Sequence, residues 1–81
     1  MGLGLTNINL NKNMVKYYVN NTAQSNGDHE VHEDGCYWLS LVVSKKDLGF
    51  HSNCKSAVTE AKKTYKKSNG CIHCSEECHT S

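Results

Sequence analysis

The sequence predicts an α+β fold, a small antiparallel β-sheet with one α-helix, held together by a zinc site. Three observations support this class. Apolar and polar residues alternate from Val15, one amphipathic helical pattern covers about residues 53–67, and cysteines and histidines cluster near 29–36 and 71–79. Strand side chains repeat with period 2, whereas residues on one helix face are three or four positions apart. We expect a flexible leader at residues 1–13 and a single small zinc-binding domain at residues 14–81.

The small size and low apolar content of the chain predict a stabilising crosslink. It has 81 residues, of which 37% are hydrophobic, with one Trp and one Phe. A core this small rarely supplies more than about 3–5 kcal/mol, so such scaffolds usually add disulfides or a metal. The net charge is +1 and arginine is absent, which disfavours sequence-specific DNA reading. No stretch approaches the roughly 20 apolar residues that span a bilayer, and no signal-peptide pattern is visible, so we expect a cytoplasmic protein.

The N-terminal half contains two strand patterns. Residues 1–13 are rich in Asn and Gly, and an added edge strand is the alternative to a flexible leader. Val15–Val19 places Val15, Tyr17 and Val19 on one face and is expected to form a strand. A polar loop then leads to a short second strand at His29–His32, in which the two histidines face opposite sides.

The C-terminal half contains the predicted helix. Tyr37–Val43 is the most apolar run of the chain and is expected to lie in the core, followed by a solvated loop and a short strand at Leu48–Phe50. Ser52 or Asn53 is expected to cap the helix, and Asn69-Gly70 to end the helical region. The residues that share the apolar helix face are Cys54, Ala57, Val58, Ala61 and Tyr65.

Two pairs of residues have the spacing of zinc half-sites. Cys71 and Cys74 form a Cys-x-x-Cys pair, and His32 and Cys36 form a His-x-x-x-Cys pair. Zinc binds thiolates and neutral imidazoles in tetrahedral array, and closely spaced ligand pairs are typical of structural sites. We therefore expect these four residues to bind one structural zinc ion. The alternative is a set of reduced, partly buried cysteines beside surface histidines.

The other cysteines and histidines leave several interpretations open. Of the five cysteines, the predicted site leaves Cys54 and Cys78, which could form a disulfide or remain a buried and an exposed thiol. A disulfide here would close a loop of about 25 residues, worth roughly 3 kcal/mol on the chain-entropy model. A rival ligand set consists of Cys71, Cys74, Cys78 and His79, although all four lie within nine residues. His29, His51 and His73 are not expected to be ligands.

The order of these parts resembles the Ada-type metal-binding domain and its small relatives, found alone or appended to bacterial nucleases. The resemblance covers about residues 29–75 and rests on four features in chain order: His32-x-x-x-Cys36, Leu48–Phe50, Ser52 before the helix, and Cys71-x-x-Cys74. It implies the same four metal ligands. The chain departs from the pattern at Ser68–Gly70, where an aromatic-x-Pro lead-in is expected. It also lacks the basic surface with which the DNA-repair version docks DNA, so methyl transfer is not implied.

The sequence favours a zinc-stabilised interaction module with a structural metal and no catalysis of its own. His29–His32 is one residue short of the H-E-x-x-H motif of zinc proteases and lies in an expected strand, and no other catalytic pattern is present. We expect a monomer with an unknown protein partner and no membrane association. Candidate contact residues are Tyr17, Tyr18, Tyr37 and Trp38.

Three alternative functions remain at this point. A nucleic-acid-associated zinc module would use the helix lysines Lys62, Lys63, Lys66 and Lys67 as phosphate contacts. A thiol-redox or metal-handling protein would use Cys54 and Cys78. A short chain of this kind could also inhibit a larger complex.

Overall fold

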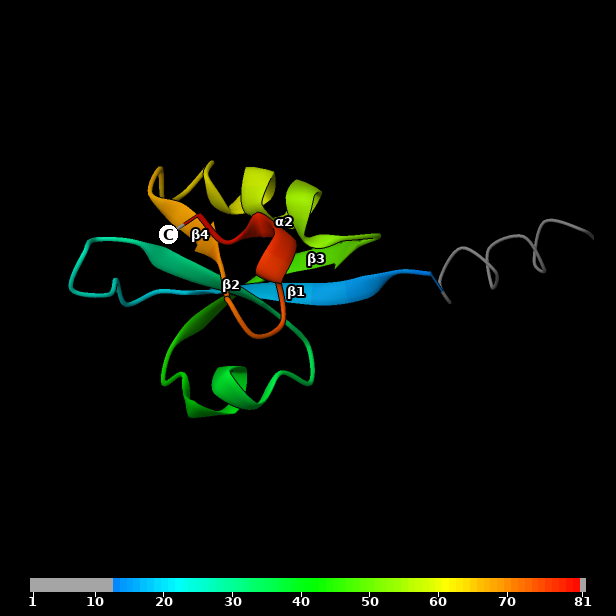
Figure 1. The fold of residues 1–81 in the computed structure, drawn as a ribbon, viewed down its shortest axis with the longest axis horizontal. Helices are drawn as coiled ribbons and strands as arrows, with labels where there is room; N and C mark the ends of the chain where they lie inside the picture. The colour runs from blue at the N-terminus through cyan, green and yellow to red at the C-terminus, as the bar shows by residue number, and fades with distance from the viewer. Residues whose placement is uncertain (1–12, 81) are drawn as a thin grey trace, which may run out of the picture.

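In the computed structural model, residues 13–80 are described, and they form a four-stranded sheet, one α-helix and two short 3₁₀-helices (Figure 1). The predicted α+β class is confirmed. All of the predicted leader except Asn13 lies outside the described residues. The elements in chain order are β1 (Val15–Asn20), β2 (His29–Glu33), η1 (Tyr37–Leu41), β3 (Lys45–His51), α2 (Cys54–Ala61), β4 (Ser68–Gly70) and η2 (Glu76–Cys78).

The sheet is antiparallel in three strands and gains a parallel edge strand that the sequence did not predict. The strand order is β3-β1-β2-β4, with β1 antiparallel to both β2 and β3. β4 pairs in parallel with β2, with His29 opposite Ser68 and Val31 opposite Gly70. The sheet is therefore mixed, and β4 carries the chain towards Cys71 alongside β2.

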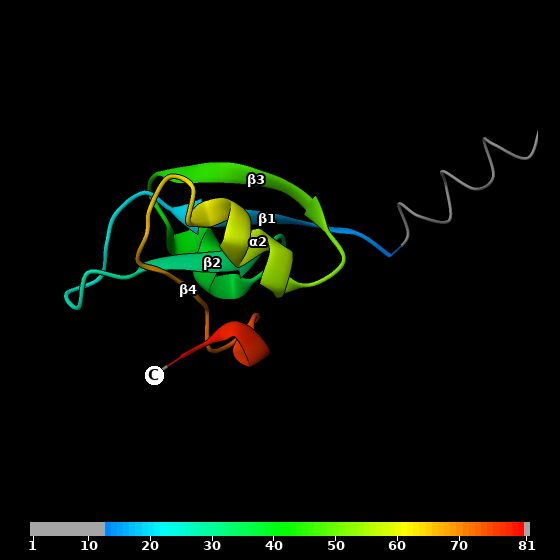
Figure 2. The ribbon, with the colours of Figure 1, turned by 90° about the horizontal axis from the view of Figure 1, so that it is seen from above.

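The core lies between one face of the sheet and α2, which crosses over the strands (Figure 2). Tyr17 and Val19 of β1 are buried there, as the alternating pattern predicts. The other buried core residues are Val31, Leu48, Cys54, Ala57 and Ala61. His32 follows Val31 in β2, so its side chain points to the opposite face of the sheet, as predicted. One face of the sheet therefore packs apolar side chains against α2, and the other face carries His32.

The helix is shorter than predicted. The strand before it, β3, is longer than predicted, and the strand after it, β4, was not predicted. Asn53 caps α2 by accepting a hydrogen bond from the backbone N–H of Lys55 at 2.8 Å, but the helix ends at Ala61 rather than near residue 67. Between residues 62 and 67, Tyr65 is the hydrophobic residue that packs against the core, so little apolar contact supports further turns. The predicted stop at Asn69-Gly70 instead lies in β4, and the predicted loop before Leu48 belongs to β3.

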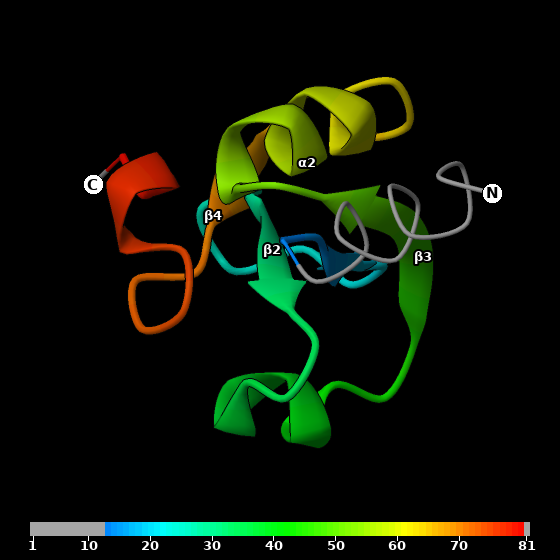
Figure 3. The same cartoon turned by 90° about the vertical axis from the view of Figure 1, so that its right-hand side faces the viewer.

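The prediction that Tyr37–Val43 lies in the core is wrong. This segment forms η1 and the turn after it, and only Leu39 is buried, whereas Tyr37 is 67% and Leu41 57% exposed. Because β1 lies between β2 and β3, the connection from β2 to β3 must cross the sheet, and it does so on the face opposite α2 (Figure 3). Within residues 13–80, that face carries no second apolar layer, so the run stays at the surface.

Candidate metal centre

The structure brings His32, Cys36, Cys71 and Cys74 together on the face of the sheet opposite α2. The possible ligand atoms of these four side chains all lie within 4.8 Å of one another, and His32 and Cys71 are buried. Such a group of three sulfurs and one imidazole could hold a metal ion. Two segments far apart in the sequence, 32–36 and 71–74, supply it, so its formation depends on the tertiary fold.

Local structure explains how the first pair reaches the site. His32 lies in β2, and the turn that follows is closed by a hydrogen bond from the backbone N–H of Cys36 to the carbonyl oxygen of Glu33 at 3.1 Å. Gly35 has a φ of +91° in this turn, a backbone conformation that glycine adopts without steric cost. The turn folds Cys36 back towards His32, and the Cys36 Sγ atom lies 3.8 Å from His32 Nδ1.

The second pair is positioned by β4. The backbone N–H of Cys71 donates to the carbonyl oxygen of Val31 at 2.9 Å and so continues the parallel pairing with β2. A tight loop then returns Cys74 to the site, where its Sγ atom lies 3.9 Å from His32 Nδ1. In a tetrahedral zinc site with Zn–S near 2.3 Å and Zn–N near 2.0 Å, ligand atoms lie about 3.5–3.8 Å apart. The spacing around His32 therefore fits a zinc ion with a contraction of a few tenths of an ångström.

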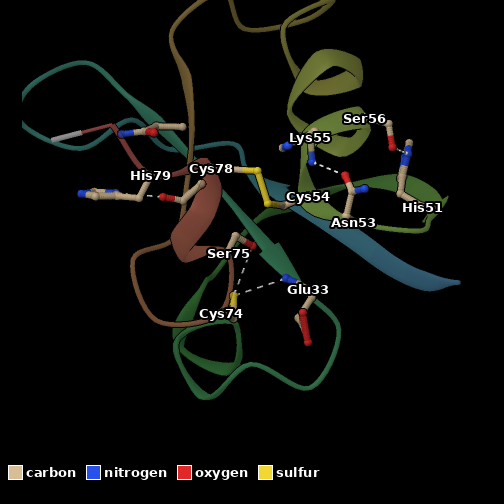
Figure 4. Close-up of a disulfide and its surroundings, with 12 residues drawn as sticks. Glu33, His51, Asn53, Cys54, Lys55, Ser56, Cys74, Ser75, Cys78 and His79 are labelled. Carbon is tan, nitrogen blue, oxygen red and sulfur yellow. Dashed lines mark hydrogen bonds between the residues drawn. A yellow bond between two sulfur atoms is a disulfide. The ribbon is translucent and has the colours of Figure 1, made fainter. Parts of the chain in front are cut away.

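Backbone N–H groups point at two of the sulfurs. The N–H of Glu33 donates to Cys74 Sγ at 3.4 Å, as Figure 4 shows, and the N–H of His73 donates to Cys71 Sγ at 3.4 Å. Ser75 Oγ lies 3.7 Å from Cys74 Sγ. Hydrogen bonds to a sulfur favour its charged form, which is the form that binds metal. These contacts surround the cysteine pair with the polar groups that a bound thiolate needs.

Burial controls protonation in the metal-free site. It raises the pKa of the Cys74 thiol to about 12, with a further contribution from the hydrogen bond to Cys36. Burial also lowers the pKa of His32 below its ordinary value, so this imidazole is neutral at pH 7. A neutral imidazole is ready to bind a metal, whereas Cys74 must first lose its proton.

Glu30 lies behind the histidine. Its Oε1 atom is 3.4 Å from His32 Nε2, the nitrogen that faces away from the thiols, and this buried nitrogen has no aligned hydrogen-bond partner among the described residues. Metal-binding histidines usually direct their second nitrogen to a carboxylate or carbonyl, which fixes the tautomer. A proton on Nε2 would leave the Nδ1 lone pair facing Cys36 and Cys74.

Cys54 and Cys78 form a disulfide, one of the two outcomes that the sequence left open (Figure 4). Because Cys78 is bonded to Cys54, the rival ligand set of Cys71, Cys74, Cys78 and His79 does not assemble. His79 instead directs Nδ1 to the carbonyl oxygen of Gly70 at 2.9 Å.

The remaining histidines lie outside the cluster. His29 stacks on Tyr65, with ring centroids 3.8 Å apart. His51 directs its ring nitrogens to Ser56 Oγ and to the Leu48 carbonyl oxygen, each at 2.8 Å. His73 is exposed and stacks on Trp38. None of the three is placed to contact a metal held by the cluster.

The candidate phosphate contacts do not share a helix face. Lys62, Lys63, Lys66 and Lys67 are exposed but follow the last residue of α2. Lys63 pairs with Glu60 at 3.0 Å, and Lys67 Nζ donates to the carbonyl oxygen of Asn26 at 2.7 Å. Of the candidate protein contacts, Tyr17 is a core residue, whereas Tyr37 and Trp38 are exposed.

The sequence alone did not identify several residues that lie around the site. Glu30 carries a signal that could have found it, because it lies two residues before His32 on the same strand face. The contact between Trp38 and His73 has no such signal in the sequence, because the two residues are 35 positions apart. Gly70 was assigned to a helix stop, yet a Cβ atom there would lie 2.7 Å from both Cys78 Cβ and the Ser75 carbonyl oxygen. Its lack of a side chain lets β4 pass beside the loop after Cys74.

Comparison of the chain with protein-family models, curated proteins and solved structures finds no match. Among residues 13–80, no helix has the length and apolar character needed to cross a membrane.

Proposed function

We propose that this protein is a small zinc-stabilised interaction module, in which His32, Cys36, Cys71 and Cys74 hold a structural zinc ion and no catalysis takes place. The observation that carries the proposal is the gathering of four ligand atoms within 4.8 Å of one another. Three thiolates and one imidazole form one of the common closed zinc sets. A catalytic zinc keeps a position open for water or substrate, and four protein ligands leave none.

The metal would supply stability that the apolar core lacks. The core is a single layer between the sheet and α2, and much of it consists of small side chains such as Ala57 and Ala61. The opposite face is held by the four-residue cluster and the buried Leu39. In small metallo-domains the free energy of metal binding is largely free energy of folding. Zinc would therefore fix the segment of η1 against the sheet.

The surface next to the metal site favours a protein partner. η1 begins directly after Cys36, and Tyr37, Trp38, Leu41 and Val43 are exposed around it. A groove of 310 Å³ runs between this segment and the sheet, lined by Trp38, Leu41 and Val43 on one side and by Asn20, Thr22 and Glu30 on the other. Exposed apolar patches commonly mark protein contact sites. We propose that a monomer presents this surface to a protein partner and that zinc holds it in shape.

The order of ligands, strand and helix supports the likeness to Ada-type metal-binding domains, which we retain as part of the proposal. The three thiols Cys36, Cys71 and Cys74 support a cytoplasmic location, because a reducing compartment keeps thiols available for metal. The Cys54–Cys78 disulfide instead favours an oxidising compartment. Nucleic-acid binding through the lysines has less support, since Lys63 and Lys67 already have partners within the chain.

Native mass spectrometry of the full chain, purified without added metal, tests the proposal together with circular dichroism before and after EDTA. We expect one zinc per chain, and a clearly lower midpoint of thermal unfolding, followed by circular dichroism, when the zinc is removed. His32→Ala and Cys74→Ser should abolish zinc retention, whereas His73→Ala, which changes an exposed histidine between the two cysteines, should retain it. A chain purified without zinc, or one that unfolds at the same temperature with and without zinc, would overturn the structural role of zinc.

A further inference from the structure

We propose that the Cys54–Cys78 disulfide regulates metal binding, so that its reduction loosens the loop that carries Cys74 and lowers the affinity of the cluster for zinc. This inference rests on the proposed zinc site. The reductant is a dithiol. It becomes a disulfide itself, and its two electrons and two protons convert Cys54 and Cys78 into thiols.

The two cysteines of the Cys-x-x-Cys pair are held in different ways. Cys71 is buried and its backbone N–H bonds to Val31, so the sheet itself fixes its position. Cys74 lies in the loop beyond the sheet. The backbone hydrogen bonds around it run within that loop, from the N–H of Ser75 to the Cys71 carbonyl oxygen at 2.8 Å and from the N–H of Cys78 to the Ser75 carbonyl oxygen at 2.9 Å. Apart from the hydrogen bond that Cys74 Sγ accepts from the backbone N–H of Glu33 at 3.4 Å, the position of Cys74 therefore depends on where the far end of the loop is anchored.

The disulfide provides that anchor. Cys54 opens α2, is 3% exposed, and packs in the core, and its bond to Cys78 ties η2 to the helix (Figure 4). The hydrogen bonds of His79 and Thr80 reach β4: His79 Nδ1 bonds to the Gly70 carbonyl oxygen at 2.9 Å, and the Thr80 N–H donates to Asn69 Oδ1 at 2.9 Å. Among the described residues, the disulfide is the covalent link between the loop and the helix layer.

The close packing at Gly70 makes the loop sensitive to this link. A Cβ atom at Gly70 would lie 2.7 Å from Cys78 Cβ and from the Ser75 carbonyl oxygen, so β4 and the loop are in direct contact there. Two separated Cys78 and Cys54 sulfurs cannot occupy the bonded positions, because nonbonded sulfur atoms need more room than a covalent bond allows. Because Cys54 is buried in the core and Cys78 Cβ packs closely at Gly70, the side chains have little room to rotate apart, and we expect the separation to move the loop relative to α2, with Ser75 and Cys74 on the moving side. A less preorganised ligand binds metal more weakly.

The coupling has a reciprocal form. If the disulfide raises zinc affinity by a given factor, bound zinc must make the disulfide harder to reduce by the same factor. The three free thiols, Cys36, Cys71 and Cys74, would be held by the metal and could not exchange with the disulfide. Loss of zinc and loss of the disulfide would thus promote each other, which suits a protein that releases its metal when a dithiol reductant reaches it.

The first test compares zinc affinity of the disulfide-bonded full chain with that of the Cys54→Ser/Cys78→Ser variant, by competition with a chelator of known affinity and with Co²⁺ absorption as the spectroscopic probe. We expect a loss of about 10- to 100-fold, the range seen when groups that position metal ligands are removed. Ala57→Gly is the matched control, because it weakens the same helix without cutting the link, and its effect on affinity should be clearly smaller. Equal affinity in the double variant, or an equal loss in the control, would overturn the coupling.

The second test does not depend on a variant. The fraction of disulfide-bonded chain is measured at equilibrium in a redox buffer made of a dithiol and its cyclic disulfide, with saturating Zn²⁺ or with EDTA, by alkylation and mass spectrometry. Zinc should shift the ratio of oxidised to reduced chain by the same 10- to 100-fold or so. An unchanged ratio would overturn the inference. A disulfide-bonded chain that gives no thiolate–Co²⁺ absorption would instead overturn the zinc site itself, which keeps the two failures distinct.

Discussion

The indole ring of Trp38 stacks on the imidazole ring of His73, with ring centroids 4.9 Å apart and planes inclined by 21°. Trp38 belongs to η1, which begins after Cys36, and His73 lies between Cys71 and Cys74. The stack therefore joins the two segments that bring cysteines to the cluster. A ring contact across the site makes Trp38 a natural reporter of whether these segments are together.

We expect the fluorescence of Trp38, the single tryptophan of the chain, to respond to metal removal. When the cysteine segments separate, the indole should lose its stacking partner and gain water contact, which shifts emission to longer wavelength. Titration with EDTA, followed by fluorescence and native mass spectrometry on the same samples, measures this. His73→Ala should shift the emission before any metal is removed. Emission that stays constant while zinc is lost would contradict the expected separation.

The stability of the metal-free protein should depend on the charge of His32. Burial lowers the pKa of His32 in the folded chain below 6.5, its value in an unfolded chain. The unfolded state therefore binds a proton first, and the stability that the neutral imidazole contributes is present above about pH 6.5 and lost as the pH falls towards the folded pKa. Urea unfolding of the EDTA-treated protein between about pH 7 and 5 checks this. His32→Gln should flatten the profile, and an unchanged profile would contradict the assignment.

Zinc binding should release the proton of Cys74. Burial raises the pKa of this thiol to about 12, so it is protonated at pH 7 before metal binds. Each displaced proton makes the apparent affinity rise about tenfold per pH unit below the thiol pKa. Chelator competition at several pH values between about 6.5 and 8.5 measures the slope. A pH-independent affinity in this range would mean that zinc does not bind Cys74 as a thiolate.

Substitution of Gly70 should destabilise the protein through overpacking. The added methyl group of Gly70→Ala would lie 2.7 Å from Cys78 Cβ and from a backbone oxygen, and neither can move freely. Overpacked sites typically cost about 1–3 kcal/mol. Gly35 is the contrast, because a Cβ there meets nothing within 4 Å but the φ of +91° strains the backbone. Thermal unfolding should therefore show that Asn, which tolerates positive φ, is accepted better at Gly35 than at Gly70.

Loss of the disulfide should lower the stability of the metal-free chain. Cys54 and Cys78 are 24 positions apart, and on the chain-entropy model a crosslink over a loop of this length is worth about 3 kcal/mol. Urea unfolding of the Cys54→Ser/Cys78→Ser variant in EDTA, compared with the intact chain, measures the difference. A difference below about 0.5 kcal/mol would mean that the crosslink removes little entropy from the unfolded chain.

Local patterns were sufficient to predict β1, β2, the start of α2 and the pairs that make up the cluster. The alternation from Val15 to Val19 has the period of a strand, and the spacing of Cys54, Ala57 and Ala61 has the period of a helix. Both can be recognised without information from the rest of the fold. The same is true of the two half-sites, because residues three or four positions apart meet through a single turn. These parts of the protein are determined by the sequence by itself.

The tertiary structure alone decided three other features. Ser68–Gly70 has no strand pattern of its own and becomes β4 because β2 offers unpaired backbone groups beside it. Tyr37–Val43 reads as core by composition but is exposed, because the strand order sends it across the face that has no apolar layer. Cys78 could have been a thiol, a ligand or half of a disulfide, and its place opposite Cys54 selects the disulfide. Each of these features depends on contacts between residues far apart in the chain. Such contacts form only when the chain folds, so they leave no local pattern in the sequence.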